Sequence, residues 1–132
     1  QRFMREDIPV LFGTEFNAGS WNSGHVVIPG CRAHVLLVTL NKQGKAEDLR
    51  YQDHWIDEQH FHWQTQNQTA PDNKRGNEII NHESLGIGLH LFVRENKLES
   101  GKAAPFKYCG QVSYQSHSGS KPMSVRFELL ER

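Results

Sequence analysis

The sequence predicts a mainly β fold of the α+β class, with a curved antiparallel sheet or open pseudo-barrel and one main helix. Seven or so short stretches carry the apolar alternation or the β-branched runs that are typical of strands. One stretch, residues 74–85, has the apolar spacing and the end residues of a helix. The chain has no internal repeat and no regular alternation of strands with helices, so we expect strands joined by turns to form most of the fold.

The length and composition predict a single domain of a larger protein. The 132 residues suit one unit with a modest core, and the start without an initiator Met leads us to expect further modules in the parent protein. The polar start is unlike a signal peptide, and no apolar run is long enough to cross a bilayer. We therefore expect a cytoplasmic location and no membrane partner. Cys31 and Cys109 lack motif spacing and are predicted to be reduced, buried thiols.

The charge balance limits the kind of nucleic-acid binding that is expected. The chain has 15 Lys and Arg residues against 15 Asp and Glu residues, a formal net charge of zero at pH 7. A generic polyanion binder would carry a basic surface, so the balance argues against that class. It leaves open a specific reader tethered to a stronger DNA-binding machine, because tethering raises the local concentration.

The first elements of the chain are expected to be a short helix and two strands. Residues 4–12 carry acidic residues in the first turn and a proline near the start, as a helix does, and Gly13 would end it. Residues 14–24 are rich in turn-forming residues and predict a loop. A short strand is expected over 25–29. The nearly continuous apolar run at 33–40 is typical of a central strand that is buried on both faces.

The stretch from Tyr51 to Asn67 concentrates aromatic, histidine and amide side chains. Residues 48–55 are expected to form one strand and residues 61–66 the next. In the second strand, apolar residues alternate with a row formed by His60, His62, Gln64 and Gln66. Imidazoles and amides donate and accept hydrogen bonds in fixed geometry, so this row suits a polar, planar ligand. The alternative is a solvated strand face that happens to be rich in Gln and His.

The second half of the chain is expected to hold the main helix and the closing strands. Asp72 or Asn73 can cap the helix over 74–85, and Gly86 would end it. A strand over 88–94 would place Leu89, Leu91 and Val93 on one face. Residues 95–104 are predicted as a polar, mobile loop. Two strands over 105–110 and 111–116 are expected to meet at a bend at Gly110. A turn over 117–122 and a last strand over 123–130 complete the chain.

Residues suited to catalysis or to metal binding lack the partners that such sites need. A Ser beside a His on a strand, as at Ser116 and His117, points to the opposite face, and the chain has no nucleophile elbow. His60 and His62 share a face, as zinc-binding His-x-His pairs do, and Asp53 or His54 could join them, yet a complete ligand set is not visible. The glycines after the helix are in the wrong context for a phosphate-binding loop. We therefore predict no catalytic residue, no metal and no cofactor.

A DNA-recognition site agrees better with the residues. Carboxylate and amide oxygens accept hydrogen bonds from the exocyclic amine of cytosine, and aromatic faces stack on an exposed base. Because Tyr51, Asp53 and Trp55 are spaced by two, they would share a strand face and form a pocket of two aromatics around one carboxylate. The alternative for each tryptophan is packing in the core. The predicted DNA-binding residues are Trp21, Tyr51, Asp53, Trp55, His62, Trp63, Gln64, Gln66, Asn67, Ser116 and His117.

Five blocks of the sequence resemble a known domain family, DUF3427. They are Tyr51-Gln-Asp-His-Trp, Phe61-His-Trp-Gln-Thr-Gln-Asn, His90-Leu-Phe-Val-Arg94, Ala104-Pro-Phe-Lys-Tyr-Cys-Gly110 and Ser116-His-Ser-Gly-Ser-Lys-Pro-Met123. The resemblance covers nearly the whole chain, with minor departures at Thr65 and Ser118. That domain follows superfamily 2 helicase modules, often with an N-terminal phospholipase-D-type nuclease, in proteins similar to modification-dependent (type IV) restriction enzymes.

The resemblance implies a recognition module of a phage-defence system, without enzyme activity of its own. Its expected partners are double-stranded DNA that carries 5-methylcytosine or 5-hydroxymethylcytosine, and the helicase and nuclease modules of the same protein. By analogy, the fold would be comparable with SRA and PUA-like readers or with the B3 barrel. Two other functions stay open: a protein-interaction or autoinhibitory domain that docks on its own helicase, and a metal-dependent nuclease that uses the histidines.

Overall fold

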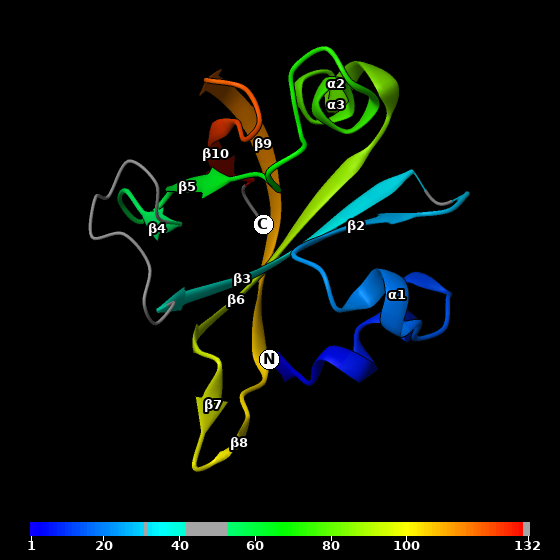
Figure 1. Cartoon of the computed structure of the whole chain (residues 1–132), viewed down its shortest axis with the longest axis vertical. Coiled ribbons are helices and arrows are strands. Elements are labelled where there is room, and N and C mark those ends of the chain that lie inside the picture. The colour runs from blue at the N-terminus through cyan, green and yellow to red at the C-terminus, as the bar shows by residue number, and fades with distance from the viewer. Residues whose placement is uncertain (31, 42–52, 131–132) are drawn as a thin grey trace.

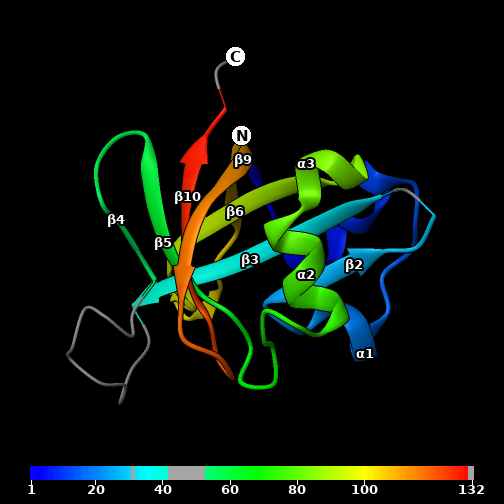
Figure 2. The ribbon, with the colours of Figure 1, turned by 90° about the horizontal axis from the view of Figure 1, so that it is seen from above.

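A curved, open β-sheet forms most of the computed structural model, which describes residues 1–30, 32–41 and 53–130 (Figures 1 and 2). In these ranges the strand order is β2-β3-β6-β9-β10-β5-β4, and β1 pairs with β9. The two end strands are not paired with each other, so the sheet is not closed into a barrel. The strands are β1 (Arg2–Phe3), β2 (His25–Ile28), β3 (Ala33–Asn41), β4 (His54–Trp55), β5 (His60–Gln64), β6 (Gly88–Asn96), β9 (Phe106–Ser118) and β10 (Ser124–Leu129). The predicted mainly β fold with a curved sheet is confirmed.

The centre of the sheet differs from the predicted antiparallel arrangement. β3 and β6 run parallel, with Ala33 opposite Gly88 and Val38 opposite Val93, whereas the other described strand pairs are antiparallel. A parallel pair needs a long crossover. Here the crossover carries β4, β5 and the helices, so it lacks the simple strand–helix–strand rhythm by which sequence analysis recognises parallel pairs.

The helices are shorter than the sequence predicts. The expected helix over 74–85 is divided into α2 (Lys74–Ile80) and α3 (His82–Leu85), because Asn81 has a non-helical ψ of 23°. The predicted cap is present, since the Asn73 side chain accepts a 3.1 Å hydrogen bond from the backbone N–H of Gly76. Gly86, at φ 73°, ends α3 as expected.

The N-terminal segment contains short helical turns in place of one helix. They are η1 (Arg5–Asp7) and η2 (Pro9–Phe12), both 3₁₀ helices, and the left-handed Gly13 ends the second as predicted. A further turn of helix, α1 (Ala18–Trp21), lies inside the segment that was expected to be a loop. No helix in the described part of the chain is long and apolar enough to cross a membrane.

Two apolar clusters pack on the two faces of the central strands. Leu36 and Val38 of β3 belong to one cluster and Val35 and Leu37 to the other, which confirms the prediction of a strand buried on both faces. The first cluster lies between the sheet and α2, which contributes Ile79. The second is covered by the N-terminal segment. Burial of a leucine or valine side chain stabilises the fold by roughly 1.5–3 kcal/mol.

The C-terminal strands also differ in detail from the prediction. β9 is one continuous strand, and the expected bend at Gly110 is a bulge, because Leu91 lies opposite Gly110 while Phe92 lies opposite Tyr108. The segment 95–104, expected to be a mobile loop, contains the end of β6 and a hairpin of β7 (Leu98–Glu99) and β8 (Lys102–Ala103). Cys109 is half-buried, whereas the sequence predicted a buried thiol. Cys31, and the predicted strand at 48–55 before residue 53, lie outside the described residues.

Candidate functional site

Two of the predicted stacking residues lie inside the core. Trp21 and Trp63 each expose 3% of their surface, and they belong to different apolar clusters. The Trp63 ring lies edge-on to His25, with 5.4 Å between ring centroids. In this arrangement neither indole ring presents a face on which a base could stack, so the core-packing alternative describes both.

Asp53 supports the backbone. Its side chain is 7% exposed, and its Oδ1 atom accepts a 2.7 Å hydrogen bond from the backbone N–H of Gln64. Beside this bond, the Thr65 N–H donates to the Met123 carbonyl, and the Met123 N–H donates to the Thr65 hydroxyl, both at 2.9 Å. The predicted pocket of Tyr51, Asp53 and Trp55 is therefore not assembled from the described residues, since Tyr51 lies outside them.

Three predicted DNA-binding residues, His62, Gln64 and Ser116, do share one face of the sheet. His54, His62, Arg126 and Ser116 lie directly opposite one another on the neighbouring strands β4, β5, β10 and β9. We call these four residues the outer row. The His54 and His62 rings stack with 4.9 Å between centroids, and Gln64 continues the same face one pair further along β5. The predicted polar strand face is thus half-buried, and its His62 ring already stacks on the His54 ring of the neighbouring strand.

The other predicted residues lie away from the outer row. Gln66 and Asn67 are exposed beyond the end of β5, and the Gln66 side chain accepts a 3.1 Å hydrogen bond from Arg75. His117 lies opposite Val125, and its Nδ1 atom is 2.7 Å from the Tyr114 hydroxyl. The structure therefore spreads the predicted site over several surfaces.

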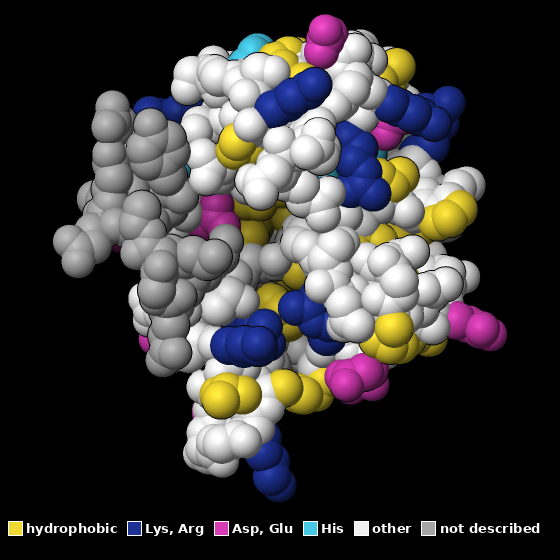
Figure 3. Space-filling view, in the orientation of Figure 1, with side chains coloured by type: hydrophobic (Ala, Val, Ile, Leu, Met, Phe, Trp, Pro, Cys, Tyr) yellow, Lys and Arg dark blue, Asp and Glu magenta, His cyan; other side chains and the backbone are white. Residues whose placement is uncertain are grey.

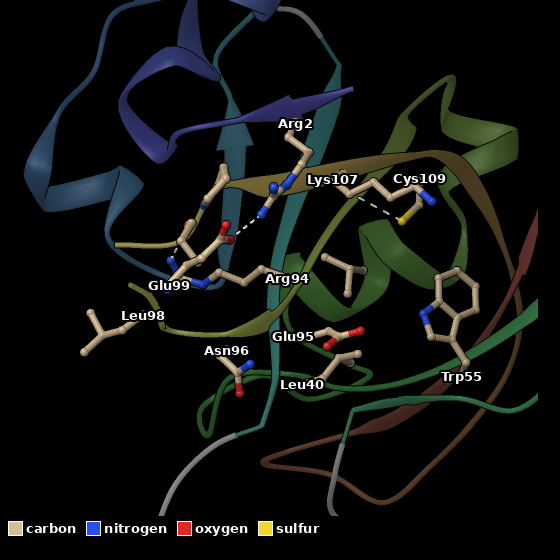
Figure 4. A pocket seen from close by; sticks show the side chains of 13 residues that line it. Arg2, Leu40, Trp55, Arg94, Glu95, Asn96, Leu98, Glu99, Lys107 and Cys109 are labelled. Carbon is tan, nitrogen blue, oxygen red and sulfur yellow. Dashed lines mark hydrogen bonds and ion pairs between the residues drawn. The ribbon is translucent and has the colours of Figure 1, made fainter. Parts of the chain in front are cut away.

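Trp55 faces the other way, into a pocket of about 610 Å³ (Figure 4). It lies opposite Phe61, one position along from His62, so it points to the inner side of the sheet. One part of the pocket wall is apolar and is formed by Leu40, Trp55, Val93 and Cys109. The other part is polar and is formed by Arg2, Arg94, Glu95, Asn96, Glu99 and Lys107. In Figure 3, this face of the molecule is hollowed near its centre, with hydrophobic and Lys or Arg side chains around the hollow.

The polar side of the pocket is rigidly held. Arg94 donates from Nε to the Thr39 hydroxyl at 2.8 Å and from Nη1 to the Ala104 carbonyl at 3.0 Å. Its guanidinium carbon lies 4.3 Å from the centroid of the Phe106 ring. Burial lowers the pKa of Arg94, and nearby Arg5 lowers it further, yet a guanidinium stays charged at neutral pH. Arg94 therefore supplies a fixed positive charge.

The charges on the pocket wall nearly balance. Arg2, Arg94 and Lys107 oppose Glu95 and Glu99, an excess of one positive charge, and Arg2 forms an ion pair with Glu99. Such a wall differs from the basic stripe that follows a phosphate backbone. It offers both donors and acceptors around an aromatic face, as sites for a single planar group do.

The described residues provide no site for a metal ion. Among them, no group of three or more His, Cys, Asp or Glu side chains is arranged to hold one. His60, half of the predicted His-x-His pair, lies 2.8 Å from the Asp57 carboxylate, whose pKa the backbone N–H of Gln59 and the His60 ring hold low. His62 stacks on His54.

Sequence reasoning missed two polar features. The first is the pocket wall at Arg94, Glu95 and Asn96, because Glu95 and Asn96 at the end of β6 were assigned to a loop. The second is a buried chain of side chains in which His25 Nε2 lies 2.8 Å from His34 Nδ1, and His34 Nε2 lies 2.7 Å from Glu78 Oε1. A histidine inside the apolar run at 33–40 was the available signal for this chain.

The comparisons with known proteins identify the family. Residues 1–131 match the family described as "Domain of unknown function (DUF3427)", so the chain belongs to it, as predicted. No curated protein matches the chain. A similar solved structure is the DNA modification-dependent restriction endonuclease AspBHI, at 13% sequence identity and a TM-score of 0.48. The match covers 76% of this chain and 32% of that enzyme, so the chain spans about a third of its length.

Proposed function

We propose that this domain is a DNA-binding module that recognises modified cytosine, 5-methylcytosine or 5-hydroxymethylcytosine, in a type IV restriction system. The observation that carries the proposal is the pocket, whose wall includes the Trp55 ring together with charged and amide side chains. The domain acts by binding, in the cytoplasm. The helicase and nuclease modules that the family resemblance implies supply ATP hydrolysis and cleavage elsewhere in the parent protein.

The two sides of the pocket suit the two sides of a modified base. A reader of such a base must remove a methyl group from water and still satisfy the polar edge of the ring. Trp55 and Val93 offer apolar surface for the ring and its methyl group, while Glu95, two positions from Val93 on the same face of β6, offers an acceptor for the edge. The pocket volume, about 610 Å³, lies within the roughly 300–1,000 Å³ of small-ligand sites.

The outer row is the competing DNA-contacting surface. Arg126, His62 and Ser116 lie side by side there, and these side-chain types contact phosphates and base edges. However, the row is on the opposite face of the sheet from Trp55, so one duplex that fills the pocket would not lie flat on the row. The two surfaces therefore predict different effects of mutations on DNA binding.

Binding measurements with matched duplexes test the proposal. Fluorescence anisotropy compares three duplexes that differ only in one position, which carries cytosine, 5-methylcytosine or 5-hydroxymethylcytosine. We expect the wild-type domain to bind at least one modified duplex more tightly, and Trp55→Ala to lose that ratio. Trp55→Phe is the control, because it keeps an aromatic face against Phe61, 4.9 Å away between centroids. Equal binding of all three duplexes by the wild-type domain would refute the modified-base proposal.

The outer row is tested with the same duplexes. Arg126→Ala and His62→Ala should leave the ratio between modified and unmodified duplexes unchanged if the pocket is the reading site. Loss of the ratio in these variants, with Trp55→Ala unaffected, would transfer the site to the outer row. Thermal melts of each variant distinguish a direct effect on DNA binding from an effect on folding.

One observation favours protein docking as a second candidate function. Val10, Leu11 and Phe16 in the N-terminal segment expose 71%, 50% and 41% of their surfaces. Exposed apolar side chains of this kind are typical of protein contacts. If the isolated domain binds no duplex at low salt but binds the helicase fragment of its parent protein, this candidate replaces DNA recognition.

A further inference from the structure

The β7–β8 hairpin projects from one end of the sheet (Figure 1). Leu98 pairs with Ala103 and Glu99 with Lys102, and the turn between them has Ser100 and Gly101 at positive φ, 54° and 80°. Two successive left-handed residues make the tight turn that matches the twist of a hairpin. Leu98 and Glu99 also line the pocket, so the hairpin and the pocket form one continuous surface.

The hairpin carries an exposed apolar side chain between two lysines. Leu98 exposes 56% of its surface although leucine is costly to leave in water. Lys97 and Lys102 are exposed, and neither forms an ion pair with any residue that the structure describes. The nearest carboxylate in the hairpin, Glu99, is neutralised by its ion pair with Arg2. The hairpin thus presents two lysines without an ion-pair partner among the described residues and, at its open end beside the pocket, one exposed leucine.

Contacts at its base hold the hairpin in place. A hairpin with two residues per strand is not stable alone. The Ala104 N–H donates to the Lys97 carbonyl at 2.9 Å, and the Ala104 carbonyl accepts from Arg94, which also binds Thr39 of β3. An arm fixed in this way loses little conformational entropy when it binds a partner.

We infer that the β7–β8 hairpin is a DNA-contacting arm, in which Leu98 enters the duplex beside the base that occupies the pocket and Lys97 and Lys102 contact the flanking phosphates. The inference rests on the proposed function, because it gives the pocket a nucleic-acid occupant. A base of a duplex can reach such a pocket only by leaving the stack, and apolar wedges such as leucine fill or open the step that it leaves. Lysines on an exposed arm neutralise phosphates and release counterions.

The test uses the same modified and unmodified duplexes, with 2-aminopurine placed next to the modified cytosine as a reporter of unstacking. We expect the wild-type domain to raise 2-aminopurine fluorescence, and Leu98→Ala to lose that rise together with at least fivefold in affinity. Lys97→Ala with Lys102→Ala should reduce the slope of log affinity against log salt by about 0.9 for each phosphate that is no longer neutralised. Leu85→Ala and Lys74→Ala, which truncate an exposed apolar and an exposed basic residue outside the hairpin, are the controls.

The outcomes separate the arm from the modified-base proposal. If the wild-type domain prefers modified DNA while the hairpin variants bind and unstack it normally, the arm is overturned and the pocket proposal stands. If the wild-type domain shows no preference but the hairpin variants lose affinity and salt dependence, the arm is supported and modified-base recognition is overturned. If the wild-type domain shows no preference and the hairpin variants bind DNA as the wild type does, both proposals are overturned.

Discussion

The Oδ1 atom of Asp53 accepts a 2.7 Å hydrogen bond from the backbone N–H of Gln64. Sequence reasoning assigned both residues to the DNA-binding site, whereas in the structure one residue holds the other in place. The bond joins the residue that precedes β4, two positions from Trp55, to the last residue of β5. Asp53 therefore positions the strand that carries the pocket's aromatic wall.

Replacement of Asp53 by Ala should lower the stability of the fold. The substitution leaves the Gln64 N–H without its acceptor at a nearly buried position, which costs about 1–3 kcal/mol of unfolding free energy. Urea unfolding measures the loss, and Asp53→Asn, which keeps a side-chain oxygen, should lose less. If Asp53→Ala unfolds like the wild-type protein and yet no longer prefers modified DNA, Asp53 belongs to the base pocket after all.

Much of the fold follows from local sequence patterns. The nearly continuous apolar run within 33–40 predicts a strand buried on both faces because adjacent side chains such as Val35 and Leu36 point to opposite sides of the sheet. The caps at Asn73 and Gly86 are local as well, since each involves residues within a few positions. The family was also predictable, because five blocks of residues carry the resemblance.

The pocket could not be predicted from local patterns. It brings together Arg2, Trp55 and Arg94, which are far apart in the sequence and meet only when β1 pairs with β9 and β3 pairs in parallel with β6. Nor does a sequence distinguish a core tryptophan such as Trp63 from an exposed one, since both kinds occur between polar residues on a strand. Register and long-range pairing decide these points.

Gly76→Ala should destabilise the domain, although alanine is the better helix former by about 1 kcal/mol. A Cβ at Gly76 would lie 1.9 Å from the carbonyl oxygen of Ala70 and 3.1 Å from the Met123 sulfur. The backbone of the loop before α2 would have to move, and the expected loss of unfolding free energy is about 1–3 kcal/mol. Lys74→Ala, exposed in the first turn of the same helix, is the control for thermal melts. A rise in melting temperature for Gly76→Ala contradicts the close approach.

The unfolding free energy should fall as the pH is lowered from about 7.5 to 5.5. Burial, then the neighbouring His34 and Arg75, hold the pKa of His25 well below its usual value. Burial also lowers the pKa of His34, although its hydrogen bond to Glu78 offsets part of this effect. Because the unfolded chain takes up protons near pH 6.5 and the folded chain does not, each buried histidine contributes a loss of up to about 1.4 kcal/mol per pH unit below that value.

Urea unfolding at a series of pH values measures this dependence. Burial lowers the pKa of His90 too, so it acts in the same direction, and His90→Gln should reduce the slope without abolishing it. Stability that stays flat or rises between pH 7.5 and 5.5 would show that the buried His25–His34 pair accepts a proton in the folded state.

Glu95→Gln should weaken the distinction between 5-methylcytosine and thymine. These two bases carry the same methyl group, and they differ at position 4, where 5-methylcytosine has an amine that donates and thymine has a carbonyl that accepts. A carboxylate can only accept, so Glu95 on the pocket wall would favour the amine and repel the carbonyl. An amide offers both a donor and an acceptor and binds less strongly than a charged acceptor. We expect the wild-type preference for 5-methylcytosine over thymine to fall by about 1–3 kcal/mol in the variant.

The comparison must remove the general effect of charge. Loss of one carboxylate raises affinity for any DNA, so the readout is the ratio between the two duplexes and not either affinity alone. Glu58→Gln, which removes an exposed carboxylate outside the pocket, should raise both affinities and leave the ratio unchanged. If Glu95→Gln behaves in the same way, then Glu95 contributes only charge, and the amine of the base is read by another group.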